Sequence, residues 1–150
     1  MKKFTPCLIA ILALAEFVCR PKLADPAGRP APELSPSDVV RIQVDALRRV
    51  DEPTPNAGIW TTFRFASPAN REITGPYGHF LRVIKSPGNG PFLHARSARL
   101  SGERQDGSSA EVTVELEGQD GLRSRFTFSL SKQGPGPFKD CWMTDSVRPL

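Results

Sequence analysis

Cysteine and histidine are scarce in this chain, which limits the cross-links and metal sites that it can build. The 150 residues include 3 cysteines and 2 histidines. Because Cys7 and Cys19 lie near the N-terminus, Cys141 alone remains for a folded domain, and no disulfide framework follows. We expect Cys141 to be an unpaired, half-buried residue, with a bridge to Cys19 in an oxidising compartment as the alternative. A zinc site needs three or four ligands held together, so we expect no metal site.

The sequence also lacks an apolar run long enough to cross a bilayer, which takes about 20 residues. Its most apolar segment, residues 7–15, follows Lys2 and Lys3 and ends at Glu16, a pattern typical of a secretory signal. We therefore expect a signal peptide over residues 1–24, cleaved after Ala15 or near Ala24. The mature protein would be periplasmic or secreted, with no stable membrane span. An uncleaved membrane anchor is the alternative.

The excess of basic over acidic residues is small when the expected signal peptide is left out of the count. The whole chain has 20 basic and 16 acidic residues and a pI of about 9.3. Cleavage after Ala24 would leave 16 basic and 15 acidic residues. A nucleic-acid-binding protein should keep a basic stripe on its folded surface, and none is evident in the sequence. We therefore expect no nucleic-acid partner.

Proline and glycine divide the rest of the chain into short elements. Residues 25–34 are rich in proline and have little to bury, which predicts a flexible linker. Residues 35–150 are enough for one packed core, so we expect a single domain there. The chain has no Gly-x-Ser-x-Gly elbow and no glycine-rich phosphate loop, and we expect no cofactor.

The first half of this domain has the pattern of helices. Ser35 followed by Pro36 predicts a helix start, and apolar residues at helical spacing continue it to about Val50. Residues 59–65 fit a helix or a strand by pattern alone, and a short helix is the preferred interpretation. Further helices are expected from Pro68 and over residues 77–84. In the last of these, one apolar face is formed by Tyr77, Phe80, Leu81 and Ile84.

After Pro91 the apolar residues recur at every second position. The strands around Val114 and Phe128 alternate in this way and are joined by a turn at residues 119–121, which predicts a hairpin. An earlier strand over residues 95–105 and a later one over residues 139–147 complete the pattern. We expect an α+β fold in which N-terminal helices pack on a curved antiparallel sheet of at least four strands.

Two segments carry a resemblance to a known family. They are residues 63–71 (Phe-Arg-Phe-Ala-Ser-Pro-Ala-Asn-Arg), followed by Thr74-Gly75-Pro76 and Phe80, and residues 141–145 (Cys-Trp-Met-Thr-Asp). With them the chain resembles family 4864 of the domain-of-unknown-function series over residues 36–147. The resemblance implies a cone-like fold similar to that of nuclear transport factor 2-like proteins, and it implies no activity. The chain departs from the family's usual pattern at residues 92–95, where Phe-Leu-His-Ala lacks the glycine that normally precedes the histidine.

The polar residues of these segments are candidate ligand contacts. An arginine pair near a helix start can hold a carboxylate or phosphate. The binding candidates are therefore Arg64, Ser67, Asn70, Arg71 and Trp142. The competing interpretation is structural, with Ser67 capping a helix, Asn70 bonded to a loop carbonyl and Arg64 in an internal ion pair. In the same way, Trp60, Tyr77, Phe138 and Trp142 can line an apolar pocket or fill the core.

The leading functional hypothesis is a non-catalytic exported module that binds a small molecule or another protein. The alternative is a cofactor-free isomerase, dehydratase or hydrolase, in which His79 or His94 acts as base beside Asp140 or Asp145. An open apolar cavity holding a histidine and a carboxylate would favour the enzyme. A cavity filled by Trp60, Phe126 and Phe128 would eliminate it. A homodimer formed through the exposed sheet face is a third possibility.

Overall fold

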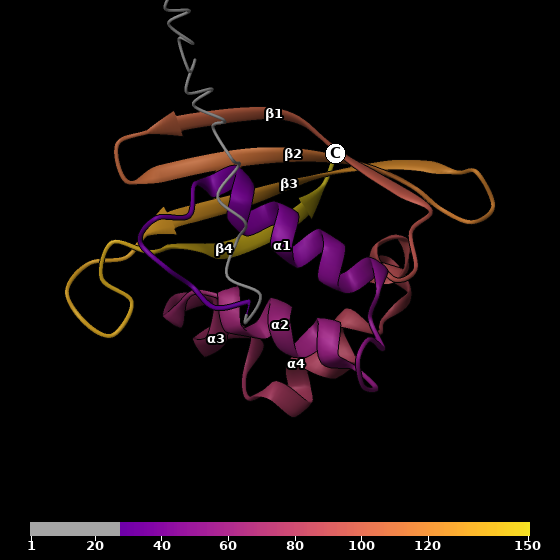
Figure 1. The fold of residues 1–150 in the computed structure, drawn as a ribbon, viewed down its shortest axis with the longest axis horizontal. Coiled ribbons are helices and arrows are strands. Elements are labelled where there is room, and N and C mark those ends of the chain that lie inside the picture. Colours follow the sequence, from indigo (N-terminus) through magenta and orange to yellow (C-terminus); the bar gives the residue numbers. More distant parts are fainter. Residues whose placement is uncertain (1–27) are drawn as a thin grey trace, which may run out of the picture.

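The computed structural model describes residues 28–150, which form helices followed by one antiparallel sheet (Figure 1). The expected α+β class is therefore confirmed. The signal peptide, its two cleavage positions, Cys7 and Cys19 lie outside the described residues. The helices are α1 (Pro36–Arg48), α2 (Ala57–Phe65), α3 (Pro68–Thr74), α4 (Tyr77–Ile84) and the 3-10 helix η1 (Pro87–Phe92), and the strands are β1 (Ser97–Asp106), β2 (Ser109–Glu117), β3 (Arg123–Lys132) and β4 (Trp142–Pro149).

The four strands pair in chain order, β1-β2-β3-β4, and every pair is antiparallel. The expected hairpin is the β2–β3 pair, in which Val112 lies opposite Phe128 and Val114 opposite Phe126. The register shifts in two places, at Ser101 of β1 and at Asp145 of β4, neither of which has a register partner on the neighbouring strand. Such irregularities bend a strand and increase its local twist, so they curve the sheet against which the helices pack.

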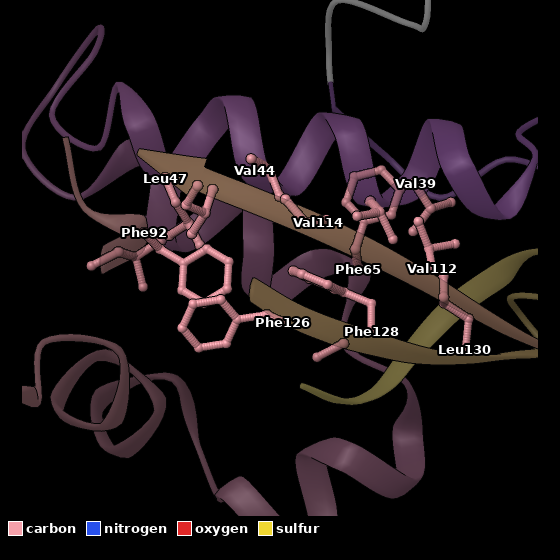
Figure 2. Close-up of a cluster of buried hydrophobic side chains, with 14 of the residues drawn as sticks. Val39, Val44, Leu47, Phe65, Phe92, Val112, Val114, Phe126, Phe128 and Leu130 are labelled. Atoms are coloured by element: carbon pink, nitrogen blue, oxygen red, sulfur yellow. The ribbon is translucent and has the colours of Figure 1, made fainter. Parts of the chain in front are cut away.

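Helix α1 lies across one face of this sheet, and α2, α3 and α4 gather beyond it on the side of β4 rather than of β1 (Figure 1). Side chains of α1 and of the alternating strands meet in a shared core (Figure 2). Val39, Val112 and Val114 have no exposed surface, and Phe128 is 1% exposed. Burial of aliphatic and aromatic side chains of this size stabilises a domain by about 2 kcal/mol each, so this layer is the main source of stability.

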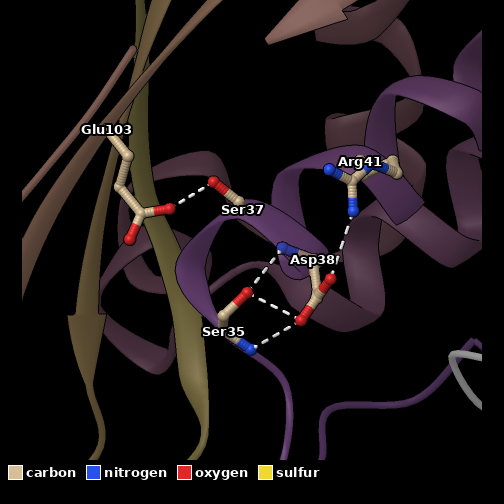
Figure 3. Close-up of polar contacts among 5 residues, drawn as sticks. All are labelled: Ser35, Ser37, Asp38, Arg41 and Glu103. Atoms are coloured by element: carbon tan, nitrogen blue, oxygen red, sulfur yellow. Dashed lines mark hydrogen bonds and ion pairs between the residues drawn. The ribbon is translucent and has the colours of Figure 1, made fainter. Parts of the chain in front are cut away.

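The start of α1 is fixed by a capping box (Figure 3). The Asp38 amide donates to Ser35 Oγ over 3.1 Å, and the Ser35 amide donates to Asp38 Oδ2 over 3.0 Å. The neighbouring Ser37 hydroxyl donates to the carboxylate of Glu103 and so connects the helix to β1. The helix start predicted at Ser35-Pro36 is confirmed.

Three predicted boundaries differ from the observed ones by two or three residues. Helix α1 ends at Arg48 rather than Val50, because Arg49 leaves the helical conformation with φ −113° and ψ 49°. Strand β1 begins at Ser97 rather than residue 95, after His94 at φ 61°. Strand β4 begins at Trp142 rather than residue 139, because Asp140 has φ 63° and the Cys141 amide donates to the carbonyl of Phe138, which forms a turn.

The segment before α1 contacts the domain in its described part, residues 28–34. Leu34 packs against the core cluster, and the carbonyl of Gly28 accepts a hydrogen bond from the Arg64 guanidinium. Within residues 28–150, no helix combines the length and the apolar character that a membrane crossing requires.

Candidate ligand-binding cavity

A cavity of about 290 Å³ lies where the helices meet β3 and β4. Small-molecule sites usually have volumes of about 300–1,000 Å³, so this one suits a small ligand. Every helix and the last two strands contribute to its walls: the lining residues are Gln43, Leu47, Thr62, Ala66, Asn70, Ile73, Thr74, Phe80, Val83, Ile84, Asn89, Phe92, Phe128, Thr144, Asp145, Ser146 and Val147.

Most of the lining is apolar. Leu47, Phe92 and Phe128 come from the buried core, and Phe80 comes from α4. At the rim, Ile73 of α3 is 83% exposed and Val147 of β4 is 39% exposed. Exposed apolar side chains at the edge of a cavity extend the surface that an apolar ligand can cover.

A polar pair lies within this apolar wall. Gln43 of α1 is 1% exposed, and its Nε2 donates to Thr144 Oγ1 over 2.7 Å and to the carbonyl of Val39 over 3.2 Å. A carbonyl can only accept a hydrogen bond, so the amide nitrogen of Gln43 faces Val39 and the orientation of the amide is settled. Thr144 of β4 is 2% exposed, so the pair spans α1 and β4 in the interior.

The junction of α2 and α3 is attached to the same strand. Ala66 forms a parallel bridge with Thr144, and the Ser67 amide donates to the Thr144 carbonyl over 2.8 Å. Asn70 Nδ2 donates to that carbonyl as well, over 3.0 Å. Ser67 Oγ caps α3 by accepting from the Asn70 amide over 3.1 Å. These bonds hold Asn70 in the cavity wall.

The two arginines among the predicted binding residues donate hydrogen bonds to backbone carbonyls of the protein itself. Arg64 donates to the carbonyl of Gly28, and Arg71 donates to the carbonyl of Arg64 over 2.8 Å. The Arg71 guanidinium also lies over the rings of Phe63 and Phe138, at 4.8 and 5.6 Å from their centroids. Burial lowers the pKa of Arg71. Neither arginine lines the cavity.

The aromatic candidates have packing roles. Trp142 is 4% exposed within the core, with Lys132 above its ring. Trp60 is 46% exposed and makes an edge contact with Tyr77, whose pKa is raised by burial. Phe138 lies beneath Arg71, and none of these aromatic rings lines the cavity.

Of the four candidate catalytic residues, Asp145 alone lines the cavity. It is half-buried, and its Oδ1 accepts from the Ser131 hydroxyl over 3.0 Å. His79 is exposed on α4 with its Nδ1 against the carbonyl of Thr74, and His94 is exposed in the loop after η1. Asp140 is exposed in the loop before β4. Residues 28–150 contain no group of three or more potential metal ligands that could hold an ion.

Cys141 is 4% exposed and has no disulfide partner within the described part of the chain. Burial raises the pKa of its thiol, and the charges of Glu33 and Asp140 raise it further. The thiol is therefore held in its neutral form, the state in which cysteine packs as a small apolar residue.

Sequence reasoning missed most of the polar lining: Gln43, Thr62, Asn89, Thr144 and Ser146. One signal was present for Gln43, which lies one helical turn from both Val39 and Leu47 on the buried face of α1. A polar side chain inside an apolar stripe must find a hydrogen-bonding partner in the interior. The position of Thr144 opposite Gln43 has no such local signal.

Comparison of the chain with protein-family models, with curated protein sequences and with solved structures finds no match.

Proposed function

We propose that this protein is an exported, non-catalytic module that binds a small molecule in the cavity between its helices and β3–β4. The observation that carries the proposal is the cavity itself: about 290 Å³ of open volume, an apolar wall and a few convergent polar groups. This combination is what small-molecule sites share. The apolar segment behind Lys2 and Lys3 supports export to the periplasm or the exterior.

We also propose that the fold is cone-like and similar to that of nuclear transport factor 2-like proteins, within family 4864 of the domain-of-unknown-function series. Helices resting on one face of a bulged antiparallel sheet, with a cavity between the two layers, support this proposal. Fold similarity carries no activity with it, so the functional proposal rests on the cavity alone.

A binding role is better supported than catalysis. The enzyme alternative requires a histidine beside a carboxylate in the cavity, whereas the lining contains Asp145 and no histidine. Proton transfer needs its base within hydrogen-bonding reach of the substrate. Trp60 and Phe126 do not fill the cavity either, so the space remains open for a ligand.

A small molecule is also better supported than a protein partner. The sheet surface away from the helices carries ion pairs such as Arg99 with Glu115 at 2.8 Å and Arg104 with Glu111 at 2.8 Å. The hydrogen bond from Arg99 lowers the pKa of Glu115. Charged residues are depleted at the centres of protein interfaces. The proposed homodimer through this face would therefore have to cover charged pairs.

The test is mass spectrometry, under native conditions, of the mature protein purified from its own host. We expect a retained small molecule at substoichiometric or full occupancy in the wild type. The substitution Val83→Trp, which places an indole in the cavity wall, should remove it, because the added ring takes the ligand's space.

Leu122→Trp is the matched control. Leu122 is 72% exposed in the β2–β3 turn and does not line the cavity, so this variant should retain the ligand as the wild type does. Equal retention by Val83→Trp, confirmed as folded by circular dichroism, would place the ligand elsewhere and contradict the proposal.

A further inference from the structure

The three side-chain amides of the cavity wall share one arrangement: each uses its NH2 group within the protein. Gln43 donates to Val39 and Thr144, and Asn70 donates to the Thr144 carbonyl. Asn89 donates to the carbonyl of Val83 over 2.9 Å. In each case at least one acceptor is a backbone carbonyl, which fixes the amide orientation. The amide oxygens of Gln43, Asn70 and Asn89 accept no hydrogen bond from residues 28–150.

The Gln43 oxygen is the most informative of the three. Gln43 is 1% exposed and lines the cavity, and none of residues 28–150 donates to its Oε1. This oxygen can therefore accept a hydrogen bond from a group that enters the cavity. The adjacent Thr144 hydroxyl accepts from Gln43, so its own proton is free to be donated. Together the pair offers one acceptor and one donor.

The charge of the lining narrows the ligand class further. Among residues 28–150, Asp145 is the only ionisable residue in the wall, and none of their lysines, arginines or histidines lines the cavity. An anionic ligand would meet a carboxylate and three amide oxygens without a cation to balance it, which is unfavourable in a largely apolar site. Carboxylates and phosphates are therefore disfavoured.

We infer that the ligand is an uncharged, largely apolar molecule carrying a hydroxyl group, which donates to Gln43 Oε1 and accepts from the Thr144 hydroxyl. A hydroxyl is complementary to this pair because it is both a donor and an acceptor. Its apolar part lies against Leu47, Phe80 and Phe128. This inference rests on the proposed function, since it names the ligand class of the same cavity.

Three probes of similar size that share a benzene ring test it: benzyl alcohol, toluene and benzoate. Each is titrated into the isotopically labelled protein at pH 7. Binding is followed in NMR spectra by the side-chain amide signal of Gln43 and by the backbone amide signals of Gln43 and Thr144. We expect benzyl alcohol to bind about tenfold more tightly than toluene, as one added hydrogen bond to a buried group allows. Benzoate should bind more weakly than either.

The variant Gln43→Leu has a similar volume and no acceptor. It should bind toluene at least as well as the wild type and lose the preference for benzyl alcohol. Gln119→Leu is the matched control: it makes the same substitution at an exposed glutamine that does not line the cavity, and it should keep the preference. If Gln43→Leu fails to fold, Thr144→Val provides the second variant, because it removes the other half of the polar pair.

The outcomes separate the two proposals. Binding of toluene and benzyl alcohol with equal affinity, or tightest binding of benzoate, would overturn the ligand class and leave the cavity as a binding site. An unchanged preference in Gln43→Leu would also overturn it. If none of the probes shifts any cavity signal and the native protein retains no ligand, the proposed function fails, and the ligand class fails with it.

Discussion

At the scale of single residues, α1 carries two kinds of polar side chain: those that cap its first turn and one that lies on its buried face. Ser35 and Asp38 satisfy the free amides of the helix start, and Gln43 places a polar group in the core. The first kind was predictable from the order Ser-Pro-Ser-Asp, because capping depends only on neighbouring residues. The second depends on Thr144, 101 residues away, and no local pattern indicates that partner.

Replacing Ser35 with alanine should lower the free energy of unfolding by about 1 kcal/mol, because the Asp38 amide loses its acceptor. Ser37→Ala is the matched control: it removes a contact at the surface with Glu103, and its effect should stay within about 0.5 kcal/mol. Urea unfolding at pH 7 measures both. Equal losses in the two variants would show that the capping bond contributes nothing.

Asp38 should also make the helix start sensitive to pH. Burial raises the pKa of this carboxyl, but the hydrogen bonds from Ser35 and the charge of Arg41 outweigh burial and lower it. A carboxyl with a lowered pKa stabilises the fold above its unfolded pKa of about 4, and this contribution is lost as the pH falls through the folded value. Urea unfolding from pH 7 to pH 2.5 should therefore show Asp38→Asn less stable than the wild type at pH 7 and nearly equal at the lowest pH. A constant difference would contradict this origin.

At the scale of elements, the contact between α1 and α2 depends on one glycine. The Gly58 amide donates to the Val50 carbonyl over 2.8 Å, and a Cβ at this position would lie 2.0 Å from the carbonyl oxygen of Ala46. The atoms that this Cβ would meet are backbone atoms of Ala46 and Val50, which cannot move aside as a flexible side chain can. This close approach places α2 beside α1. It also positions Thr62 and Ala66, which form part of the cavity wall.

Gly58→Ala should therefore lower the free energy of unfolding by about 1–3 kcal/mol through overpacking. Gly78→Ala in α4 is the control, because a Cβ there has no atom within 4 Å and alanine favours the helix by up to about 1 kcal/mol. Thermal unfolding should show the melting temperature falling for the first variant and unchanged or rising for the second. A tolerated Gly58→Ala would mean that the two helices can separate without cost.

The elements themselves were largely predictable, whereas their ends were not. Alternation in β2 and β3 and the apolar stripe of α1 reflect burial of one face, which each element carries in its own sequence. The end of α1 and the starts of β1 and β4 depend on turns in which Arg49, His94 and Asp140 leave regular geometry. His94 and Asp140 have positive φ, a conformation that is uncommon outside glycine and that histidine and aspartate adopt more often than most other residues.

At the scale of the whole molecule, the export proposal makes a prediction about mass. The mature protein secreted by its host should lack the first 15 or about 24 residues, because a signal peptidase removes a leader of this composition. Intact-mass measurement and N-terminal sequencing of the protein from the periplasmic or extracellular fraction test this. Recovery of the full-length chain in a membrane fraction would instead support the uncleaved anchor.

The sequence by itself determined the class of the fold, the main elements and the helix caps, because each of these depends on residues close together in the chain. The tertiary structure decided the site. Gln43, Asn70, Asn89 and Thr144 come from four separate segments, and they meet in one cavity wall because α1 and α3 pack against β4 and η1 packs against β3. Arg64 and Arg71, the polar residues most visible in the sequence, instead donate hydrogen bonds to the carbonyls of Gly28 and Arg64. The spacing of apolar residues indicates which face of a helix or strand is buried. Which residues of other elements contact that face is decided only when elements far apart in the sequence pack together.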